Sequence, residues 1–269
     1  MIRLPDIAIP DETQALLDGY QAEVDGAGDF AAQVAEAKRL FSARNKSTNP
    51  AFRVIRKKLD ELCGGSGRCC YCELSQPDEV EHVRPKDWFP EVVFAWSNYT
   101  YSCGPCNGPK NNQFAVFKRG SRTLTRLVRE RDDPVNPPPA GSPALIDPRT
   151  ENPLDFMELD LSETFLFVET ANEGTREYER AKYTIEVLRL NERDVLTRAR
   201  RGAFHSFRAI LREAVELKST GASDNEIDAK RIVIQQLPHP SVWQEMKRQR
   251  LDNKQLAELF DAIPEALNW

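Results

Sequence analysis

The sequence predicts an α+β fold in which a small cysteine-rich module is embedded in a mainly helical protein. Three observations predict this fold. Helical periodicity recurs near both ends of the chain, two C-x-x-C pairs lie in its middle, and the later stretch FMELDLSETFLFVET alternates apolar and polar residues as strands do. The 269 residues are enough for one large domain or two modest ones.

Composition and local charge narrow the class of protein. Hydrophobic residues make up 40% and charged residues 29%, as in soluble globular proteins. The N-terminal stretch MIRLPDIAIPDETQ does not have the pattern of a signal peptide, and no segment approaches the ~18 apolar residues of a membrane span. We therefore expect a cytoplasmic protein, whose reduced cysteines favour metal ligation over disulfides.

The charge is unevenly distributed along the chain. The net charge is −5, yet the segment from Arg53 to Arg131 holds 14 lysines and arginines against 9 acidic residues. All six cysteines lie in this basic segment. A basic middle in an acidic protein indicates a phosphate-bearing partner such as a nucleic acid.

Residues 1–62 are predicted to form an N-terminal helical region. DETQALLDGYQAEV and DFAAQVAEAKRLF have helical periodicity, and AFRVIRKKLDEL places Phe52, Ile55 and Leu59 on one face. The turn-rich CGGSGRCCYC then begins the cysteine-rich module, which we assign to residues 63–131.

Residues 132–149 are rich in proline and are predicted to be a linker, followed by a mainly helical C-terminal region over residues 150–269. Asn191 is a candidate N-cap, Ser223 and Glu226 form a capping box, and His239-Pro240 stops the helix that this box begins. The helix after Asn191 has an apolar stripe that we expect in the core, made of Leu196, Ala199, Ala203, Phe207, Ile210 and Ala214.

The cysteines predict a structural zinc site. Two C-x-x-C knuckles with 30 residues between them suit four thiolates around one tetrahedral Zn²⁺. The predicted ligands are Cys69, Cys72, Cys103 and Cys106. Cys63 and Cys70 are left over as packing or exposed thiols, because a C-x-C spacing does not form a knuckle.

Residues that suit hydrolytic chemistry lie between and directly after the knuckles. Glu81 and His82 are neighbours in VEHVRPK, and Asn107 follows the last cysteine. Carboxylate and amide oxygens are ligands for Mg²⁺ or Mn²⁺, and histidine can deprotonate water near neutral pH. Since adjacent strand residues face opposite ways, we expect a twist or bulge that lets Glu81 and His82 serve one phosphate.

This order of residues resembles the HNH endonucleases of the ββα-metal fold, in the zinc-ribbon form C-x-x-C…(D/E)-H…N…C-x-x-C-N-x-x-K. The resemblance runs from Cys69 to Lys110 and implies a small ββα-metal module with a four-cysteine zinc ribbon. It implies that Glu81 and Asn107 hold a catalytic Mg²⁺ or Mn²⁺, that His82 is the general base and that Asn98 braces the hairpin loop. Many HNH enzymes have Asp in place of Glu81 and His in place of Asn107, and both keep ligand atoms.

A narrower resemblance uses the same residues. CCYCE, VEHVRPK, WSNYTYSCGPCNGPKNN and LIDPRTENP are similar to segments of the PtuB-like HNH nucleases of Septu and retron-associated antiphage systems, and AKYTIEVLRLNERDVLTRAR resembles the helix that follows. The resemblance implies a DNA endonuclease that acts in antiphage defence and is gated by an ABC-type ATPase. We expect this partner to dock on residues 150–269.

Basic side chains near the motif are candidate nucleic-acid contacts: Arg84, Lys86, Lys110, Arg119 and Arg122. Two arginine series have helical spacing, one adjacent to the motif and one further along that we interpret as solvated. The first series is Arg119, Arg122, Arg126 and Arg129, and the second is Arg198, Arg201, Arg208 and Arg212 with His205. We also expect Gly108-Pro109 in the first turn of a helix, with Asn107 near its N-cap.

Two alternatives to a DNA endonuclease stay open. The motif recognises phosphate, so an HNH enzyme acting on structured RNA such as tRNA would have the same residues. A zinc-ribbon module that binds nucleic acid without cleaving it would keep the cysteines and the basic residues, and a cleavage assay separates it from an enzyme.

Overall fold

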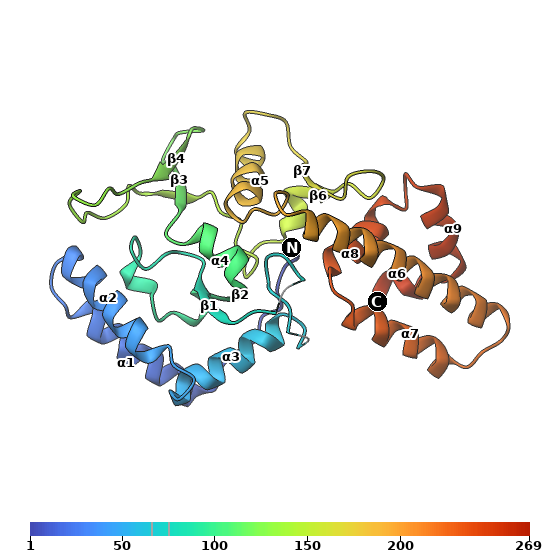
Figure 1. Ribbon diagram of the computed structural model, residues 1–269, viewed down its shortest axis with the longest axis horizontal. Coiled ribbons are helices and arrows are strands. Elements are labelled where there is room, and N and C mark those ends of the chain that lie inside the picture. Colours follow the sequence, from blue (N-terminus) through green and yellow to red (C-terminus); the bar gives the residue numbers. More distant parts are fainter. Residues whose placement is uncertain (66, 75) are drawn as a thin grey trace.

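The computed structural model describes residues 1–65, 67–74 and 76–269, and it has the predicted α+β architecture (Figure 1). The α-helices of the described residues are α1 (Asp11–Asp25), α2 (Phe30–Arg44), α3 (Pro50–Leu62), α4 (Gly104–Lys110), α5 (Arg176–Val187), α6 (Asp194–Ser219), α7 (Asp224–Gln236), α8 (Pro240–Gln249) and α9 (Lys254–Ala262). The strands are β1 (Glu79–His82), β2 (Tyr99–Ser102), β3 (Phe114–Lys118), β4 (Leu124–Leu127), β5 (Gly141–Pro143), β6 (Met157–Leu159) and β7 (Phe167–Glu169).

The helices α1, α2 and α3 form a layer against the loop that joins β1 to β2. Asp29 caps α2 by accepting a hydrogen bond from the backbone of Ala32, and Asn49 caps α3 in the same way. The predicted face of α3, with Phe52, Ile55 and Leu59, is fully buried. The apolar faces of the three helices share one core cluster with the loop, so this layer positions the segment that follows β1.

Three small sheets supply the β-structure of the described residues. Strands β1 and β2 pair antiparallel, with Glu81 opposite Thr100 and His82 opposite Tyr99. A second sheet has the order β4-β3-β5, and β6 pairs with β7 in a third. The alternating stretch after the prolines was predicted to supply one or two strands, and β6 and β7 confirm it.

The segment predicted as a linker takes part in the fold. Within residues 132–149, β5 pairs with β3, and Ala144, Leu145 and Ile146 are buried. Gly141 lies so close to β3 that a Cβ atom there would be 2.4 Å from the carbonyl oxygen of Phe117. The proline-rich composition of this segment predicted a linker and no strand. Strand β5 is only three residues long, so its pairing with β3 identifies it and local sequence does not.

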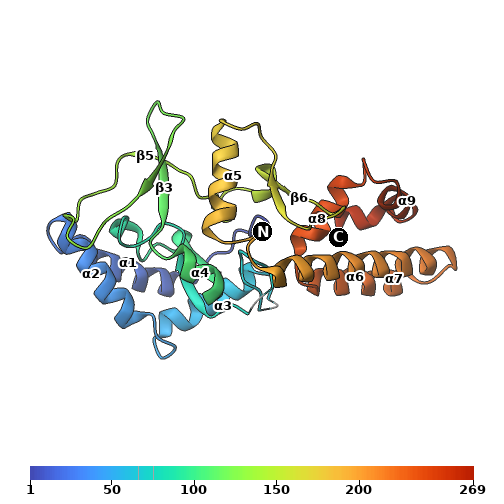
Figure 2. The ribbon, with the colours of Figure 1, turned by 45° about the horizontal axis from the view of Figure 1, so that its top comes forward.

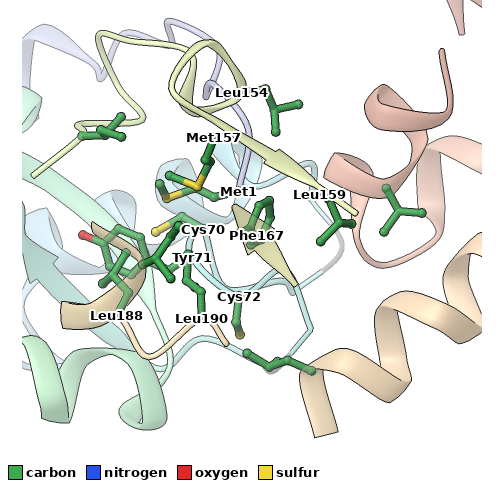
Figure 3. Close-up of a cluster of buried hydrophobic side chains, with 14 of the residues drawn as sticks. Met1, Cys70, Tyr71, Cys72, Leu154, Met157, Leu159, Phe167, Leu188 and Leu190 are labelled. Atoms are coloured by element: carbon green, nitrogen blue, oxygen red, sulfur yellow. The ribbon is translucent and has the colours of Figure 1, made fainter. Parts of the chain in front are cut away.

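One hydrophobic core spans the predicted boundary at residue 150. Met157 of β6 and Leu188 and Leu190 after α5 belong to the same buried cluster as Cys70 and Tyr71 of the first knuckle (Figure 3). The C-terminal region therefore packs directly on the cysteine-rich module.

The C-terminal half is built on α6, which runs beside α7 and outward from the centre of the molecule (Figure 2). Four residues of its predicted stripe are buried, namely Leu196, Ala203, Phe207 and Ala214. The capping box of Ser223 and Glu226 at α7 is confirmed. Within residues 1–65, 67–74 and 76–269, no helix has the length and apolar character needed to cross a membrane.

The prediction that Asn191 caps α6 is wrong. The helix begins at Asp194 after Arg193, and no side-chain hydrogen bond caps it. The amide of Asn191 instead accepts a hydrogen bond from the Phe167 backbone nitrogen at 2.9 Å and donates one to its carbonyl at 2.7 Å. The side chain of Asn191 therefore makes a tertiary contact with β7, and it does not cap the start of α6.

The shared core predicts that Met157→Ala destabilises the cysteine-rich module and the C-terminal region together. Loss of this buried side chain should lower the free energy of unfolding by about 2–5 kcal/mol, in one transition that also releases the metal. Val168→Ala on the facing strand is the control and should cost below about 1 kcal/mol, because Val168 is partly exposed. Urea unfolding monitored by circular dichroism and by a zinc-sensitive dye measures both, and two separate transitions would contradict the shared core.

Candidate functional site

The two knuckles meet in a cluster of four buried thiols. The Sγ atoms of Cys69, Cys72, Cys103 and Cys106 all lie within 4.8 Å of one another. The Sγ atoms of Cys72 and Cys103 are 3.8 Å apart, which is about the edge of a tetrahedron with Zn–S bonds of ~2.3 Å. The backbone nitrogen of Cys103 also donates to the Cys69 sulfur at 3.4 Å. The donor set and its spacing fit the predicted structural zinc.

The electrostatics of the cluster favour a cation at its centre. Burial raises the pKa of the Cys69 thiol, so the thiolate form needs a nearby positive charge. Arg193 donates from Nη2 to the Cys106 sulfur at 3.1 Å, which brings a charge from the start of α6 to the knuckles. Arg193 is not among the predicted site residues, because 87 residues separate it from Cys106 and no local motif marks it.

Glu81 faces α4 and is paired with a buried lysine. Lys110 Nζ lies 2.5 Å from Glu81 Oε1 and 2.7 Å from the carbonyl oxygen of His82, and its side chain is fully buried. Burial raises the pKa of the Glu81 carboxyl, while Lys110 acts in the opposite direction. Lys110 therefore clamps α4 onto β1. The prediction that Lys110 contacts phosphate does not fit its complete burial, and we leave it out of the proposed nucleic-acid surface.

His82 lies on the opposite face of β1 from Glu81. We expected a twist or a bulge here, and the regular β1–β2 pairing through Glu81 and His82 excludes a bulge at these two residues. The imidazole is 4% exposed, and its Nε2 lies 2.9 Å from the carbonyl oxygen of Val93. Its ring centroid is 4.4 Å from that of Phe41 in α2. Burial, helped by the charge of Lys86, lowers the pKa of His82 to about 3, so the ring is neutral at physiological pH.

Asn98 holds the loop that follows His82. Its Oδ1 accepts a hydrogen bond from the Arg84 backbone nitrogen at 2.8 Å. Its Nδ2 donates to the carbonyl oxygens of Arg84 at 3.1 Å and of Val92 at 3.0 Å. These are the contacts expected of a bracing asparagine, and they tie both ends of the loop to the start of β2.

Asn107 presents an amide oxygen that is suited to a metal. Its Oδ1 is buried, and among the described residues it has no hydrogen-bond partner, while its Nδ2 donates to Glu79. An unpaired buried oxygen on a side chain that also contacts the Glu79 carboxylate fits the oxygen ligands that Mg²⁺ or Mn²⁺ prefers. Glu79 is not among the predicted site residues either, although its spacing of two residues from Glu81 places both on one face of the strand.

The predicted position of Asn107 at a helix N-cap is wrong. Helix α4 begins at Gly104, with Cys103 in extended conformation as its N-cap and Pro105 in its first turn. Asn107 therefore lies in the middle of α4, and Pro109 lies near its end. Cys103 and Cys106 both belong to the cysteine cluster, and α4 begins between them at Gly104, three residues before Asn107.

The arginine series adjacent to the motif is not a helical stripe. It runs through the β3–β4 hairpin, which turns at Gly120 with φ of 77°. Arg126 is paired with Glu186 at 2.7 Å, and Arg129 stacks on Trp88 at 4.0 Å. Arg84, Arg119 and Arg122 reach the surface, whereas Lys86 is half-buried with its Nζ over the Phe41 ring.

The second basic face is on α6, as predicted. Its members Arg198, Arg201, His205 and Arg212 reach the surface, and Arg208 is half-buried. This exposure agrees with a solvated face.

Comparison with known proteins gives one short similarity. A stretch of 58 residues is 43% identical to Septu protein PtuB from Bacillus thuringiensis, covering 20% of this chain and 23% of that protein. The chain therefore matches less than a quarter of the relative's length. No family model matches the chain, and no solved structure matches it. The partial similarity and the four-cysteine cluster fit a Septu-like HNH nuclease.

The cysteine cluster predicts that the purified protein carries about one zinc per chain. Cys103→Ser should lose the zinc and become protease-sensitive, because structural zinc contributes folding free energy. Cys63→Ser is the matched control and should keep the zinc, since Cys63 is outside the cluster. Elemental analysis and limited proteolysis measure both effects. Well-folded wild-type protein without zinc would rule out the site.

Proposed function

We propose that this chain is a metal-dependent HNH endonuclease that hydrolyses phosphodiester bonds of DNA as the effector of an antiphage defence system. The observation that carries the proposal is the ββα unit of β1, β2 and α4. Glu81 and His82 end its first strand, Asn98 braces its loop, Asn107 lies on its helix, and the cysteine cluster closes it. The partial similarity to Septu PtuB supports the defence role.

In this proposal each residue has a separate task. Glu81 and Asn107 would hold a Mg²⁺ or Mn²⁺, and such an ion would supply positive charge near the leaving oxygen. His82 would accept the proton of the attacking water through Nδ1, because its Nε2 has to donate to the carbonyl oxygen of Val93. Asn98 keeps His82 and its loop in place. Arg84, Arg119 and Arg122, together with Lys86, contact the nucleic-acid backbone.

The burial of His82 and Glu81 favours a second candidate function, a zinc module that binds nucleic acid without cleaving it. Only 4% of His82 and 6% of Glu81 are exposed in this structure. Structured RNA is the alternative substrate, since the same residues would act on its phosphates.

We also propose that residues 150–269 dock an ABC-type ATPase that controls access to His82. An unrestrained nuclease would attack the DNA of its host, so the activity needs a gate. Co-expression with an ATPase encoded beside this chain should give a stable complex. Deleting residues after Pro148 is a poor test of docking, because it removes part of the core on which the first knuckle packs. Failure of the full chain to co-purify with such an ATPase would contradict this proposal.

The function predicts that His82→Ala lowers the cleavage rate by about 10²–10⁴-fold while the fold and the zinc are kept, because the water loses its base. His205→Ala is the control, since His205 is an exposed histidine on α6. Supercoiled plasmid and total RNA, each incubated with Mg²⁺, Mn²⁺ or EDTA and with or without the ATPase, report the substrate and the metal. Cleavage at the wild-type rate by His82→Ala would show that the base assignment is wrong.

Asn107→Ala should weaken the metal dependence and the cleavage together, because one ligand oxygen is lost. The equivalent change Glu81→Ala is less informative. It leaves the buried Lys110 without its partner, which typically costs about 3–5 kcal/mol of stability. Asn107 is half-buried and its side chain pairs only with Glu79 among the described residues, so its replacement disturbs the fold less.

A further inference from the structure

One face of the β1–β2 hairpin carries several side-chain oxygens. Glu79 and Glu81 are two residues apart on β1, so their side chains point to the same face. Ser102 is the β2 residue opposite Glu79, and its side chain lies on that face too. Helix α4 packs against this face, where Asn107 contacts Glu79 and Lys110 contacts Glu81 (Figure 1). The hairpin and the helix therefore enclose these oxygens.

The two metal ligands of the proposed function, Glu81 and Asn107, bring no net charge to this face. Lys110 Nζ lies 2.5 Å from Glu81 Oε1, and both side chains are buried, so the charge of Glu81 is balanced. The amide of Asn107 is neutral. The affinity of a protein site for a divalent cation depends on the number of charged ligands, so this site needs another carboxylate.

Glu79 is the carboxylate that is available. It is half-buried, and among the described residues it forms no ion pair. Its Oε2 accepts a hydrogen bond from Nδ2 of Asn107. This bond orients the amide, so that Oδ1 is the atom of Asn107 that is left for a cation. Glu79 therefore supplies both an unbalanced negative charge and the orientation of a ligand.

Two buried oxygens on this face have no hydrogen-bond partner among the described residues. They are Oδ1 of Asn107 and Oγ of Ser102, whose side chain is fully buried. Burying an unpaired oxygen costs free energy, so two of them beside one carboxylate indicate a ligand. A water would satisfy both oxygens and leave the charge of Glu79 unbalanced, whereas a cation satisfies all three groups. Carboxylate, hydroxyl and amide oxygens are the hard ligands that Mg²⁺ and Mn²⁺ select.

We propose that Glu79 and Ser102 complete, together with Asn107, a divalent-cation site between the β1–β2 hairpin and α4. This inference rests on the proposed function and adds two residues to the metal site of that function. Glu79 provides the net negative charge, and Ser102 provides a buried hydroxyl oxygen. The pair of Glu81 and Lys110 holds α4 against β1 beside them.

Binding of Mn²⁺ to the full-length, zinc-loaded protein tests this site in the absence of nucleic acid. Electron paramagnetic resonance of free Mn²⁺ gives the number of bound ions and their Kd, and elemental analysis shows whether the zinc is kept. The wild-type protein should bind about one Mn²⁺ per chain in addition to its zinc. Mg²⁺ should displace this Mn²⁺, because both ions select oxygen ligands.

Removing the charge of Glu79 should weaken this binding. Glu79→Gln keeps the size of the side chain and an acceptor for Asn107, and should raise the Kd for Mn²⁺ about 10–100-fold. Ser102→Ala removes an oxygen and no charge, and should raise the Kd about threefold or more. Asp78→Asn is the matched control. It removes a charge from the neighbouring, exposed residue and should leave the Kd within about twofold of the wild-type value.

A second substitution should restore the site. In the double variant Glu79→Gln with Asn107→Asp, the carboxylate moves from β1 to α4 and the site regains its charge. The Kd of this variant should return to within about tenfold of the wild-type value. A purely structural role of Glu79 would not give this recovery, because a charge on α4 does not restore the lost side chain.

Three outcomes would overturn the site. The wild-type protein could bind no Mn²⁺, or Mn²⁺ could bind with unchanged Kd to folded, zinc-loaded Glu79→Gln or Ser102→Ala. In the third outcome Asp78→Asn weakens binding as much as Glu79→Gln does, which indicates a general effect of surface charge. Ser102→Ala carries the test if Glu79→Gln does not fold.

The outcomes for the cation site and for the nuclease are separate. A protein that binds Mn²⁺ through Glu79 and cuts neither DNA nor RNA would remove the nuclease assignment and leave the cation site in place. Metal-dependent cleavage at the wild-type rate by Glu79→Gln, with unchanged Mn²⁺ binding, would remove Glu79 from the site and leave the nuclease assignment in place.

Discussion

The site depends on four thiols that are held within 4.8 Å of one another in a buried cluster. The cluster joins the turn before β1 to the start of α4 and so fixes both ends of a unit that contains little hydrophobic core of its own. Four neighbouring thiolates repel one another, so a divalent cation is the natural partner of this arrangement. Arg193 adds a positive charge from the start of α6, which links the C-terminal half to the same cluster.

The two faces of β1 have different neighbours, and this difference organises the rest of the site. Glu81 meets Lys110 of α4 in a buried ion pair, whereas His82 meets Phe41 of α2. A buried charge pair in good geometry orients its two elements even where its net contribution to stability is small. The first face therefore positions α4 and Asn107, and the second face couples the histidine to the N-terminal helices. The proposed base and the proposed metal ligands therefore lie on opposite sides of one strand.

The C-terminal half is joined to the cysteine-rich module by a common core. Leu188, Leu190 and Met157 pack against Cys70 and Tyr71 (Figure 3). A partner that binds the C-terminal half would therefore contact a part of the protein that shares its hydrophobic core with the first knuckle. Such packing transmits displacement, because cores are close to crystalline in density.

The sequence by itself determined the α+β class, the four cysteines of the cluster, the buried face of α3, the strands after the prolines and the capping box of α7. These features depend on periodicity and on spacing within a few residues, which local sequence records. The tertiary structure alone decided that Lys110 pairs with Glu81, that Phe41 packs against His82, that Arg193 reaches Cys106 and that Asn191 bonds to β7. Each of these contacts joins residues far apart in the chain, and burial determines which polar groups must find a partner. For the same reason β5 was hidden in a proline-rich segment, since a three-residue strand exists only through its pairing with β3.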